Sequence, residues 1–335
     1  MPIASSAKLV SSILDKAKLE QRPTRDGFGL GVVEAGKSDP NVVVLCADLS
    51  VSTQAEMFRK AFPERFIETG IAEQSMAALA AGMALAGKVP FIASYAAFSP
   101  GRNNEQIRTT AALQNTNVKI MGAHAGVSVG PDGATHQALE DMTIMRVIPN
   151  MKVFAPCDVW EAKKIVMEIA RVYGPCYMRF AREKTPVFTT EETPFAIGQA
   201  PLFWNSAKEK RDVAIFACGP LVYESILAAA ELEKAGWGVE VYNSPSVKPL
   251  DEKMVLAAAK KAGAIVTAEE HQVAGGLGGA IAEFLSENYP VPVVKVGVRD
   301  RFGESGKPEE LMVEFGLVAK NVVEAAKKAK SLKSK

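Results

Sequence analysis

One acidic residue stands where it could take part in proton chemistry. Glu73 lies in the stretch GIAEQ, where a short strand expected to end at Thr69-Gly70 gives way to an apolar, alanine-rich helix. A carboxylate in apolar surroundings can share or move a proton. The same carboxylate can also do no more than stabilise the helix N-terminus through the macrodipole, by ~0.3–1 kcal/mol. The motif by itself leaves both interpretations open.

Two aromatic residues follow in the next expected strand. The stretch VPFIASYAAFSPGR places Tyr95 and Phe98 at the end of that strand, before a loop that contains a glycine. Ligands of parallel sheets bind beyond the carboxyl ends of the strands, so rings at this position can line a ligand crevice. The alternative is that both rings belong to an ordinary hydrophobic core.

A third segment, KIMGAHAGVSVGPDGATHQALEDM, collects further reactive side chains. It predicts a strand, then a glycine-rich loop with His124, Asp132 and His136, then a helix that begins near Gln137. Such a loop is uncommon unless it has a function. Taken singly, either histidine could be structural, and Asp132 suits a turn in Pro-Asp-Gly.

The elements that must position these residues follow from the hydrophobic pattern. Short β-branched runs alternate with alanine-rich helical patterns, which is typical of α/β proteins with parallel sheets. We expect strands in the first part of the chain at residues 42–46, 66–68, 89–94, 118–122, 152–155 and 176–180.

A second alternation begins at Asp212, after a stretch interrupted by three prolines. The chain has 335 residues, and a prior of ~150 residues per domain predicts two domains. Each is expected to be a mostly parallel sheet flanked by helices. We expect the first domain at residues 1–190, a linker at 191–210 and the second domain at 211–335.

Composition narrows the class of protein. The 39 Lys and Arg residues nearly balance 38 acidic residues, so the chain lacks the positive field of a nucleic-acid binder. No apolar run reaches the ~18 residues of a membrane span, and neither nucleic acid nor membrane is expected as a partner. Four cysteines without a CxxC pair predict buried thiols in a cytoplasmic protein.

Two further segments are given structural interpretations. The N-terminal stretch around Leu9 to Ala17 has helical spacing and predicts a packing helix, with no signal-peptide core. Gly275-Gly276-Leu277-Gly278-Gly279 lies before an expected apolar helix, but its spacing is not G-x-G-x-x-G. Close packing is therefore favoured there over phosphate binding.

Taken together, GIAEQ, Tyr-x-x-Phe, GxHxGxxVGxDGxTHQ, LED and SGKPEEL resemble the C-terminal portion of transketolases. The resemblance covers most of the chain, and the string VGPDGATHQALED is its most specific part. It implies a pyrimidine-binding domain for thiamine diphosphate, followed by a transketolase C-terminal domain. It also implies the activity, which is transfer of a two-carbon ketol unit from a ketose phosphate to an aldose phosphate.

The resemblance assigns cofactor roles to four residues. In such enzymes a glutamate hydrogen-bonds the pyrimidine ring, so that the cofactor's own amino group can remove the C2 proton. Glu73 matches that glutamate, and Tyr95 and Phe98 resemble the rings that pack against the pyrimidine. Asp48, in CADLS, also matches a position near the cofactor, although an Asp after a strand can simply cap the next helix.

The substrate side is assigned in the same way. Arg25, Ser52, His124 and Arg182 resemble residues that reach the substrate phosphate and nearby hydroxyls. Two arginines suit a phosphate dianion. Asp132 resembles the carboxylate that binds a sugar hydroxyl, and His136 resembles the imidazole near the donor carbonyl. Both histidines are thus candidate catalytic residues.

One expected part is missing from the sequence. Transketolases hold the diphosphate through Mg²⁺ with a Gly-Asp-Gly motif, and this chain has none. The resemblance therefore implies that a partner, an N-terminal transketolase subunit, binds most of the Mg²⁺ or other divalent cation. We expect no metal ligands in this chain. The implied assembly is an α2β2 tetramer with two active sites.

Three alternatives remain open. The beta subunit of a 2-oxoacid dehydrogenase has a similar length and the same activating glutamate, but its site does not need His124, Asp132, His136, Arg25 and Arg182. A 1-deoxyxylulose-phosphate synthase has a similar loop but normally carries its own diphosphate domain. A regulatory subunit could keep the fold without the chemistry.

Overall fold

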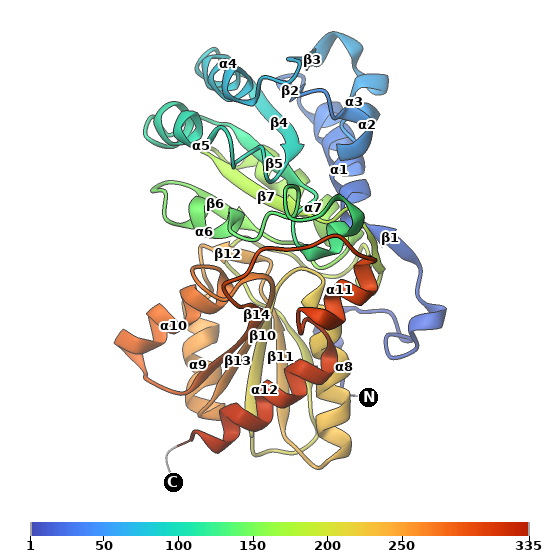
Figure 1. The fold of residues 1–335 in the computed structure, drawn as a ribbon, viewed down its shortest axis with the longest axis vertical. Helices are drawn as coiled ribbons and strands as arrows, with labels where there is room; N and C mark the ends of the chain where they lie inside the picture. Colours follow the sequence, from blue (N-terminus) through green and yellow to red (C-terminus); the bar gives the residue numbers. More distant parts are fainter. Residues whose placement is uncertain (1, 334–335) are drawn as a thin grey trace.

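The computed structural model describes residues 2–333 as two α/β domains, one above the other in Figure 1. The upper domain is coloured from blue to green and contains the first part of the chain. The lower domain is coloured from yellow to red. The blue N-terminal segment runs down beside the lower domain, so the two domains share residues from both ends of the chain.

Seven of the described strands form the sheet of the first domain, in the order β12-β6-β7-β5-β4-β2-β3. All neighbours are parallel except β12, which pairs antiparallel with β6. The strands are β2 (Val42–Cys46), β3 (Phe66–Glu68), β4 (Val89–Tyr95), β5 (Lys119–Ala123), β6 (Lys152–Phe154), β7 (Cys176–Phe180) and β12 (Ser246–Lys248). A separate antiparallel pair joins β1 (Gln21–Pro23) to β8 (Lys184–Pro186).

Helices cover both faces of this sheet. Successive residues of a strand point to opposite faces, and accordingly Val42 and Val44 pack toward α1 (Thr24–Ser38) and α7 (Val159–Arg171). Val43 packs with α4 (Glu73–Leu85) on the other face. The remaining helical segments of this domain are α2 (Ser50–Thr53), α3 (Glu56–Ala61), η3 (Pro63–Arg65), α5 (Asn104–Gln106), η4 (Ile107–Ala112), η5 (Val127–Asp132) and α6 (Asp141–Arg146).

The second domain has a sheet of five described strands in the order β14-β13-β10-β11-β9. Only β9 runs antiparallel to its neighbour. The strands are β9 (Leu202–Asn205), β10 (Val213–Ala217), β11 (Val239–Asn243), β13 (Ile265–Gln272) and β14 (Val293–Val298). The helices are α8 (Leu221–Lys234), α9 (Glu252–Ala262), α10 (Leu277–Asn288), α11 (Pro308–Glu314) and α12 (Ala319–Ser331).

The predicted fold class of two α/β domains is confirmed, and the expected strands lie within a few residues of the observed ones. The division at residues 190 and 210 stays a prediction, and the sheets cross it in two places. Leu202–Asn205, inside the expected linker, forms β9 and pairs with β11. Ser246–Lys248, from the expected second domain, forms the edge strand of the first sheet.

The expected N-terminal packing helix is wrong. The segment forms only two short turns, η1 (Ser5–Ala7) and η2 (Lys16–Lys18). Ala7 and Ile13 enter the core of the second domain, and the backbone N–H of Val10 donates to the carbonyl of Phe188. Short isolated helices are marginal, so these tertiary contacts prevail over the helical spacing.

The helix expected near Gln137 begins instead at Asp141, as α6. Ala138 pairs with Ala125 in an isolated parallel bridge, and the Gln137 side chain is used for hydrogen bonds within the loop. The backbone is therefore committed to loop contacts before the helix can start.

Two other expectations can be compared with the structure. The four cysteines are buried and free. Between residues 2 and 333, no helix combines the length and apolar character required to cross a membrane.

Candidate active site

The predicted site residues gather because the strands of the first sheet are parallel. Their carboxyl ends lie at the same edge of the sheet, and the segments that follow them carry the reactive side chains. Glu73 follows β3, Tyr95 ends β4, His124 follows β5, Arg182 follows β7, and Asp48 and Ser52 follow β2.

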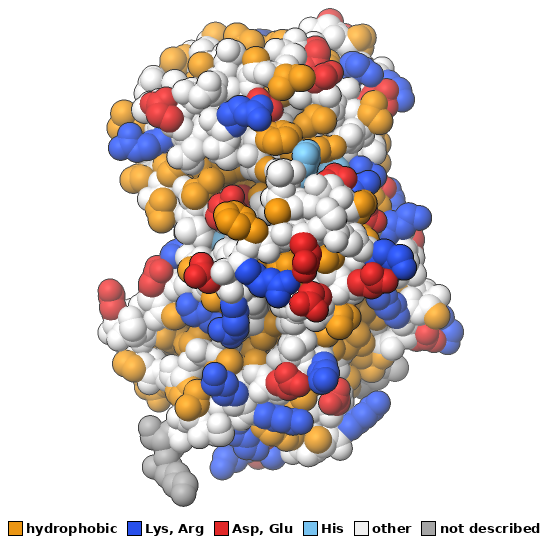
Figure 2. Space-filling view, in the orientation of Figure 1, with side chains coloured by type: hydrophobic (Ala, Val, Ile, Leu, Met, Phe, Trp, Pro, Cys, Tyr) orange, Lys and Arg blue, Asp and Glu red, His pale blue; other side chains and the backbone are white. Residues whose placement is uncertain are grey.

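Two rings and two imidazoles form the centre of the site. The Tyr95 ring stacks on that of His124 with centroids 3.9 Å apart and on that of Phe98 at 5.9 Å. His136 meets Phe98 edge to face at 5.4 Å and Tyr95 at 5.9 Å. Figure 2 shows histidine atoms at the surface of the upper domain beside hydrophobic side chains. The rings thus form a partly exposed platform, which is not an ordinary closed core.

Glu73 begins α4, as predicted, and its side chain is only 1% exposed. Its carboxylate accepts a hydrogen bond at 2.8 Å from the Arg102 guanidinium, which lies 4.9 Å from the Phe98 ring centroid. Asn103 donates to the backbone carbonyl of Glu73 at 3.1 Å. The carboxylate is therefore buried beside the aromatic platform and has one charged partner.

His124 is held in an unusual backbone conformation at the end of β5. Its φ is 56°, in the left-handed region that few non-glycine residues adopt, and such conformations cluster at functional sites. The ring is 2% exposed, and Nδ1 is buried without a hydrogen-bond partner in the described structure. Burial, together with the charges of Arg25, Arg182 and His136, lowers the pKa of His124 to about 3. His124 is therefore a neutral imidazole at physiological pH.

The arginines approach the same histidine from two sides. Arg25 Nη1 donates to the carbonyl of Ser52 at 3.0 Å, and Arg25 Nε is buried without a partner in the described structure. Arg182 Nη1 donates to the carbonyl of Val129 at 2.9 Å and contacts the Asp132 carboxylate at 3.3 Å. Positive charge thus surrounds His124, where an anionic group can be bound.

Two predicted residues contact the rest of the site less directly. His136 is partly exposed, and its Nδ1 lies 2.9 Å from the hydroxyl of Thr135. Asp48 is exposed, with a φ of 56°, and its backbone N–H donates to the Glu68 carboxylate at 2.8 Å. Asp48 does not cap α2, because the N-cap residue there is Leu49. The structure does not bring Asp48 into contact with the aromatic platform.

The second domain holds the histidine loop in place. Gln137 Nε2 lies within hydrogen-bonding distance of the carbonyls of Val127 and Gly130 in the loop and of Glu304 in the second domain, at 2.9–3.2 Å. The buried Glu270 carboxylate accepts from the N–H of Ser128 at 2.7 Å. A Cβ on Gly303 would lie 1.7 Å from Gln137 Oε1, so only glycine fits there.

Sequence reasoning missed three of these residues. Arg102 is the only cation between Phe98 and Asn104, which is the signal that could have singled it out. Gln137 stands in the THQ motif, where the local pattern indicates only a helix start. Glu270 comes from the other domain, and nothing local in the sequence predicts its contact with Ser128.

Other candidate sites carry less chemistry. The N-terminus of α10, where the glycine-rich stretch lies, is occupied by the Glu269 carboxylate, which accepts from the N–H groups of Leu277 and Gly278 at 2.8 Å. An internal anion therefore takes the place that a phosphate would need. Within residues 2–333, no group of three His, Cys, Asp or Glu residues is placed to hold a metal ion.

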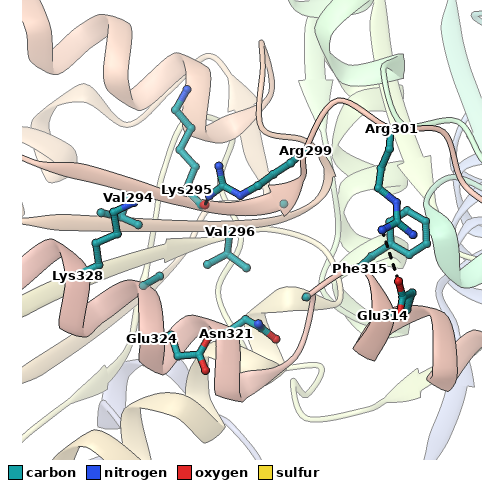
Figure 3. Close-up of a pocket in the computed structure, with 13 residues that line it drawn as sticks. Val294, Lys295, Val296, Arg299, Arg301, Glu314, Phe315, Asn321, Glu324 and Lys328 are labelled. Carbon is teal, nitrogen blue, oxygen red and sulfur yellow. Dashed lines mark hydrogen bonds and ion pairs between the residues drawn. The ribbon is translucent and has the colours of Figure 1, made fainter.

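A surface pocket of about 400 Å³ lies between β14 and α12 in the second domain (Figure 3). Its cations are partly neutralised, since Arg301 stacks on Phe315 at 3.8 Å and pairs with Glu314 and Glu304. None of the predicted site residues lines this pocket. The carboxyl edge of the first sheet remains the candidate active site.

Comparison with known families agrees with this location. The family described as transketolase, pyrimidine binding domain matches residues 20–187, and the transketolase C-terminal domain matches residues 204–322. The chain belongs to the transketolase family. The two matched regions correspond to the two α/β domains, so the fold expected from the sequence resemblance is confirmed.

Known members of the transketolase family match the whole of this architecture. The 6-deoxy-6-sulfo-D-fructose transketolase subunit SqwH of Clostridium sp. is 42% identical over 311 residues, covering 93% of this chain and 95% of that protein. A subunit of the apulose-4-phosphate transketolase of Phocaeicola vulgatus is 34% identical and is covered to 97%, with 91% of this chain. The chain spans about half the length of rat transketolase.

Solved structures of the family agree as well. A structure described as a split gene transketolase, an inactive beta4 tetramer, is 45% identical and matches with a TM-score of 0.86. The match covers 93% of this chain and 99% of that one. This chain is thus similar to the C-terminal subunits of split transketolases.

The family is thiamine-diphosphate dependent, and the residues present fit the pyrimidine half of that cofactor. A buried carboxylate lies next to a platform of two stacked rings, which is the donor set that an aminopyrimidine requires. The described residues offer no comparable cradle for a diphosphate with its metal. The fit therefore concerns one half of the cofactor.

The state of His124 predicts how stability depends on pH. Unfolded His124 binds a proton below about pH 6.5, whereas the folded chain does not until about pH 3, so stability falls as pH drops through this window. Between pH 7.5 and 5.0, we expect His124→Asn, which tolerates a positive φ, to lose about 2 kcal/mol less unfolding free energy than wild type. Urea denaturation at both pH values and fixed protein concentration measures this. Equal losses in both proteins would contradict it.

Proposed function

We propose that this chain is the C-terminal subunit of a thiamine-diphosphate-dependent transketolase. The complex transfers a two-carbon ketol unit from a ketose phosphate to an aldose phosphate, the exchange used in the pentose phosphate pathway. The observation that carries this proposal is the buried carboxylate of Glu73 beside the stacked rings of Tyr95 and Phe98. A proton relay to a heteroaromatic ring needs this combination of burial and flat apolar surface.

When bound, the cofactor supplies a carbon nucleophile that attacks the ketose carbonyl. Glu73 would hydrogen-bond the pyrimidine ring nitrogen and share its proton. Tyr95 and Phe98 would pack against the ring, and Asp48 would lie at the border of the cofactor site. Burial excludes water from the Glu73 carboxylate, so its proton is shared with the ring and not with solvent.

The substrate side of the proposal uses the remaining residues. The neutral imidazole of His124 can accept or donate a hydrogen bond to a sugar hydroxyl, and His136 can move a proton at the donor carbonyl. Asp132 would bind a sugar hydroxyl near the loop. Arg25 and Arg182, with Ser52 beside Arg25, would hold the anionic end of the sugar.

The diphosphate and its Mg²⁺, or another divalent cation, are assigned to an N-terminal partner subunit. Two sets of observations support this assignment. The sequence has no Gly-Asp-Gly motif, and relatives named as subunits are covered nearly to their full length. We infer an α2β2 assembly in the cytoplasm, in line with four cysteines that are free and buried.

The nature of the anionic end is a separate question. One relative with 42% identity is named for a sulfonated sugar and another for a sugar phosphate. Sulfonate and phosphate both present oxygens that a guanidinium can bind, so Arg25 and Arg182 suit either. We propose phosphate as the natural group, because two arginines match the charge of a dianion, and sulfonate as the second candidate.

Reconstitution tests the activity. The chain, co-purified with an N-terminal subunit and supplied with thiamine diphosphate and Mg²⁺, is expected to convert xylulose 5-phosphate and ribose 5-phosphate. The chain alone is expected to be inactive, because it lacks a diphosphate site. Comparing fructose 6-phosphate with 6-deoxy-6-sulfofructose as donors then decides between phosphate and sulfonate. Activity of the isolated chain, or oxidative decarboxylation of pyruvate in place of ketol transfer, would refute the proposal.

Arg25 provides a test of substrate binding within that complex. Arg25→Met is expected to raise KM for xylulose 5-phosphate about 10- to 100-fold, as loss of a charge-assisted hydrogen bond costs ~1.5–3 kcal/mol. KM for the phosphate-free ketose erythrulose should change much less. Arg22→Met is the matched control, since Arg22 pairs only with Glu20 and Asp26. Equal effects on both donors would show that Arg25 does not bind the anion.

A further inference from the structure

The ion pair between Arg102 and Glu73 is unusual in its asymmetry. The Glu73 side chain is 1% exposed, whereas that of Arg102 is 49% exposed, and Arg102 Nη1 donates to Glu73 Oε2 at 2.8 Å. Isolated buried carboxylates are costly, because desolvation is not compensated without a partner. A half-exposed arginine thus supplies the counter-charge for a buried carboxylate.

The backbone around Arg102 is anchored while its side chain is not. Neighbouring Asn103 is fully buried, and its Nδ2 donates to the Glu73 carbonyl and to Ser99 Oγ, each at 3.1 Å. In the described structure, the Arg102 guanidinium hydrogen-bonds only Glu73, and it lies over the Phe98 ring. Side-chain rotation alone can therefore remove Arg102 from the carboxylate without disturbing the loop.

The two groups that Arg102 touches are the two that the proposed function assigns to the cofactor ring. Glu73 would have to hydrogen-bond the pyrimidine, and Phe98 would have to pack against it. A guanidinium at 2.8 Å from the carboxylate and 4.9 Å from the ring centroid competes for both contacts.

We propose that Arg102 is an exchangeable counter-charge. It neutralises Glu73 while the cofactor is absent, and thiamine diphosphate displaces it when the pyrimidine binds. The inference rests on the proposed function of Glu73, and it gives a role to the loop Ser99–Asn103. A protein whose binding-competent form is only partly populated shows a weakened apparent affinity, in proportion to that fraction.

Substitution of Arg102 tests the proposal in the complex with the N-terminal subunit. Arg102→Met keeps the apolar stem over Phe98 but cannot pair with Glu73. We expect its dissociation constant for thiamine diphosphate to fall about 10-fold, equivalent to about 1.4 kcal/mol, when titrated by calorimetry with Mg²⁺ in excess. Arg102→Gln is a second variant, in case the methionine side chain disturbs folding.

A matched control is available in the same domain. Arg59 is 44% exposed, pairs with Glu56 at 3.1 Å and lies 5.7 Å from the Phe66 ring centroid, away from the site. Arg59→Met is expected to leave the dissociation constant unchanged. In a Glu73→Gln background, where the ion pair is already lost, Arg102→Met should change it by less than about 2-fold.

A structural readout complements the titration. In crystals of the complex, the Arg102 Nη1 to Glu73 Oε2 distance should be near 2.8 Å without cofactor and beyond about 4 Å with it. Unchanged or weaker cofactor binding by Arg102→Met, or an intact pair beside bound cofactor, would overturn the exchange while leaving the proposed function in place. A wild-type complex that binds no thiamine diphosphate would instead overturn the proposed function, and the exchange with it.

Discussion

The site depends on one physical constraint, which is that the buried carboxylate of Glu73 must have a partner. Removing a carboxylate from water costs several kcal/mol unless a cation or hydrogen-bond donors compensate. In this structure Arg102 provides the compensation from a partly exposed position. The arrangement gives the carboxylate a dry environment for proton sharing and leaves its partner free to leave.

The rest of the architecture brings other groups to this carboxylate. Parallel strands end at one edge, so the loops after β2, β4, β5 and β7 meet there. The second domain then fixes the longest of these loops through Gln137, Glu270 and the close approach of Gly303. Its contribution to the site is thus positional, as it holds the loop that carries His124 and His136 without supplying a reactive group to the platform.

Much of this could be predicted from the sequence, because local patterns fix the strands and the ordered motifs fix the family. Glu73 at the start of its helix, the Tyr95–Phe98 pair and the two histidines all lie where the sequence pattern predicts them. The errors arise where tertiary contacts prevail. The N-terminal segment packs on the second domain without forming a helix, Gln137 uses its side chain in the loop, and β12 crosses to the first sheet. Periodicity does not report such long-range contacts.

The central claim is that Glu73 activates the cofactor ring. The most direct measurement is the rate of hydrogen–deuterium exchange at C2 of bound thiamine diphosphate, followed by NMR after acid quenching, in the complex with the N-terminal subunit. At saturating cofactor, the account predicts that Glu73→Gln slows this exchange by at least about 100-fold, the scale of a lost general acid–base group. Exchange as fast as in the wild-type complex, with the cofactor fully bound, would contradict it.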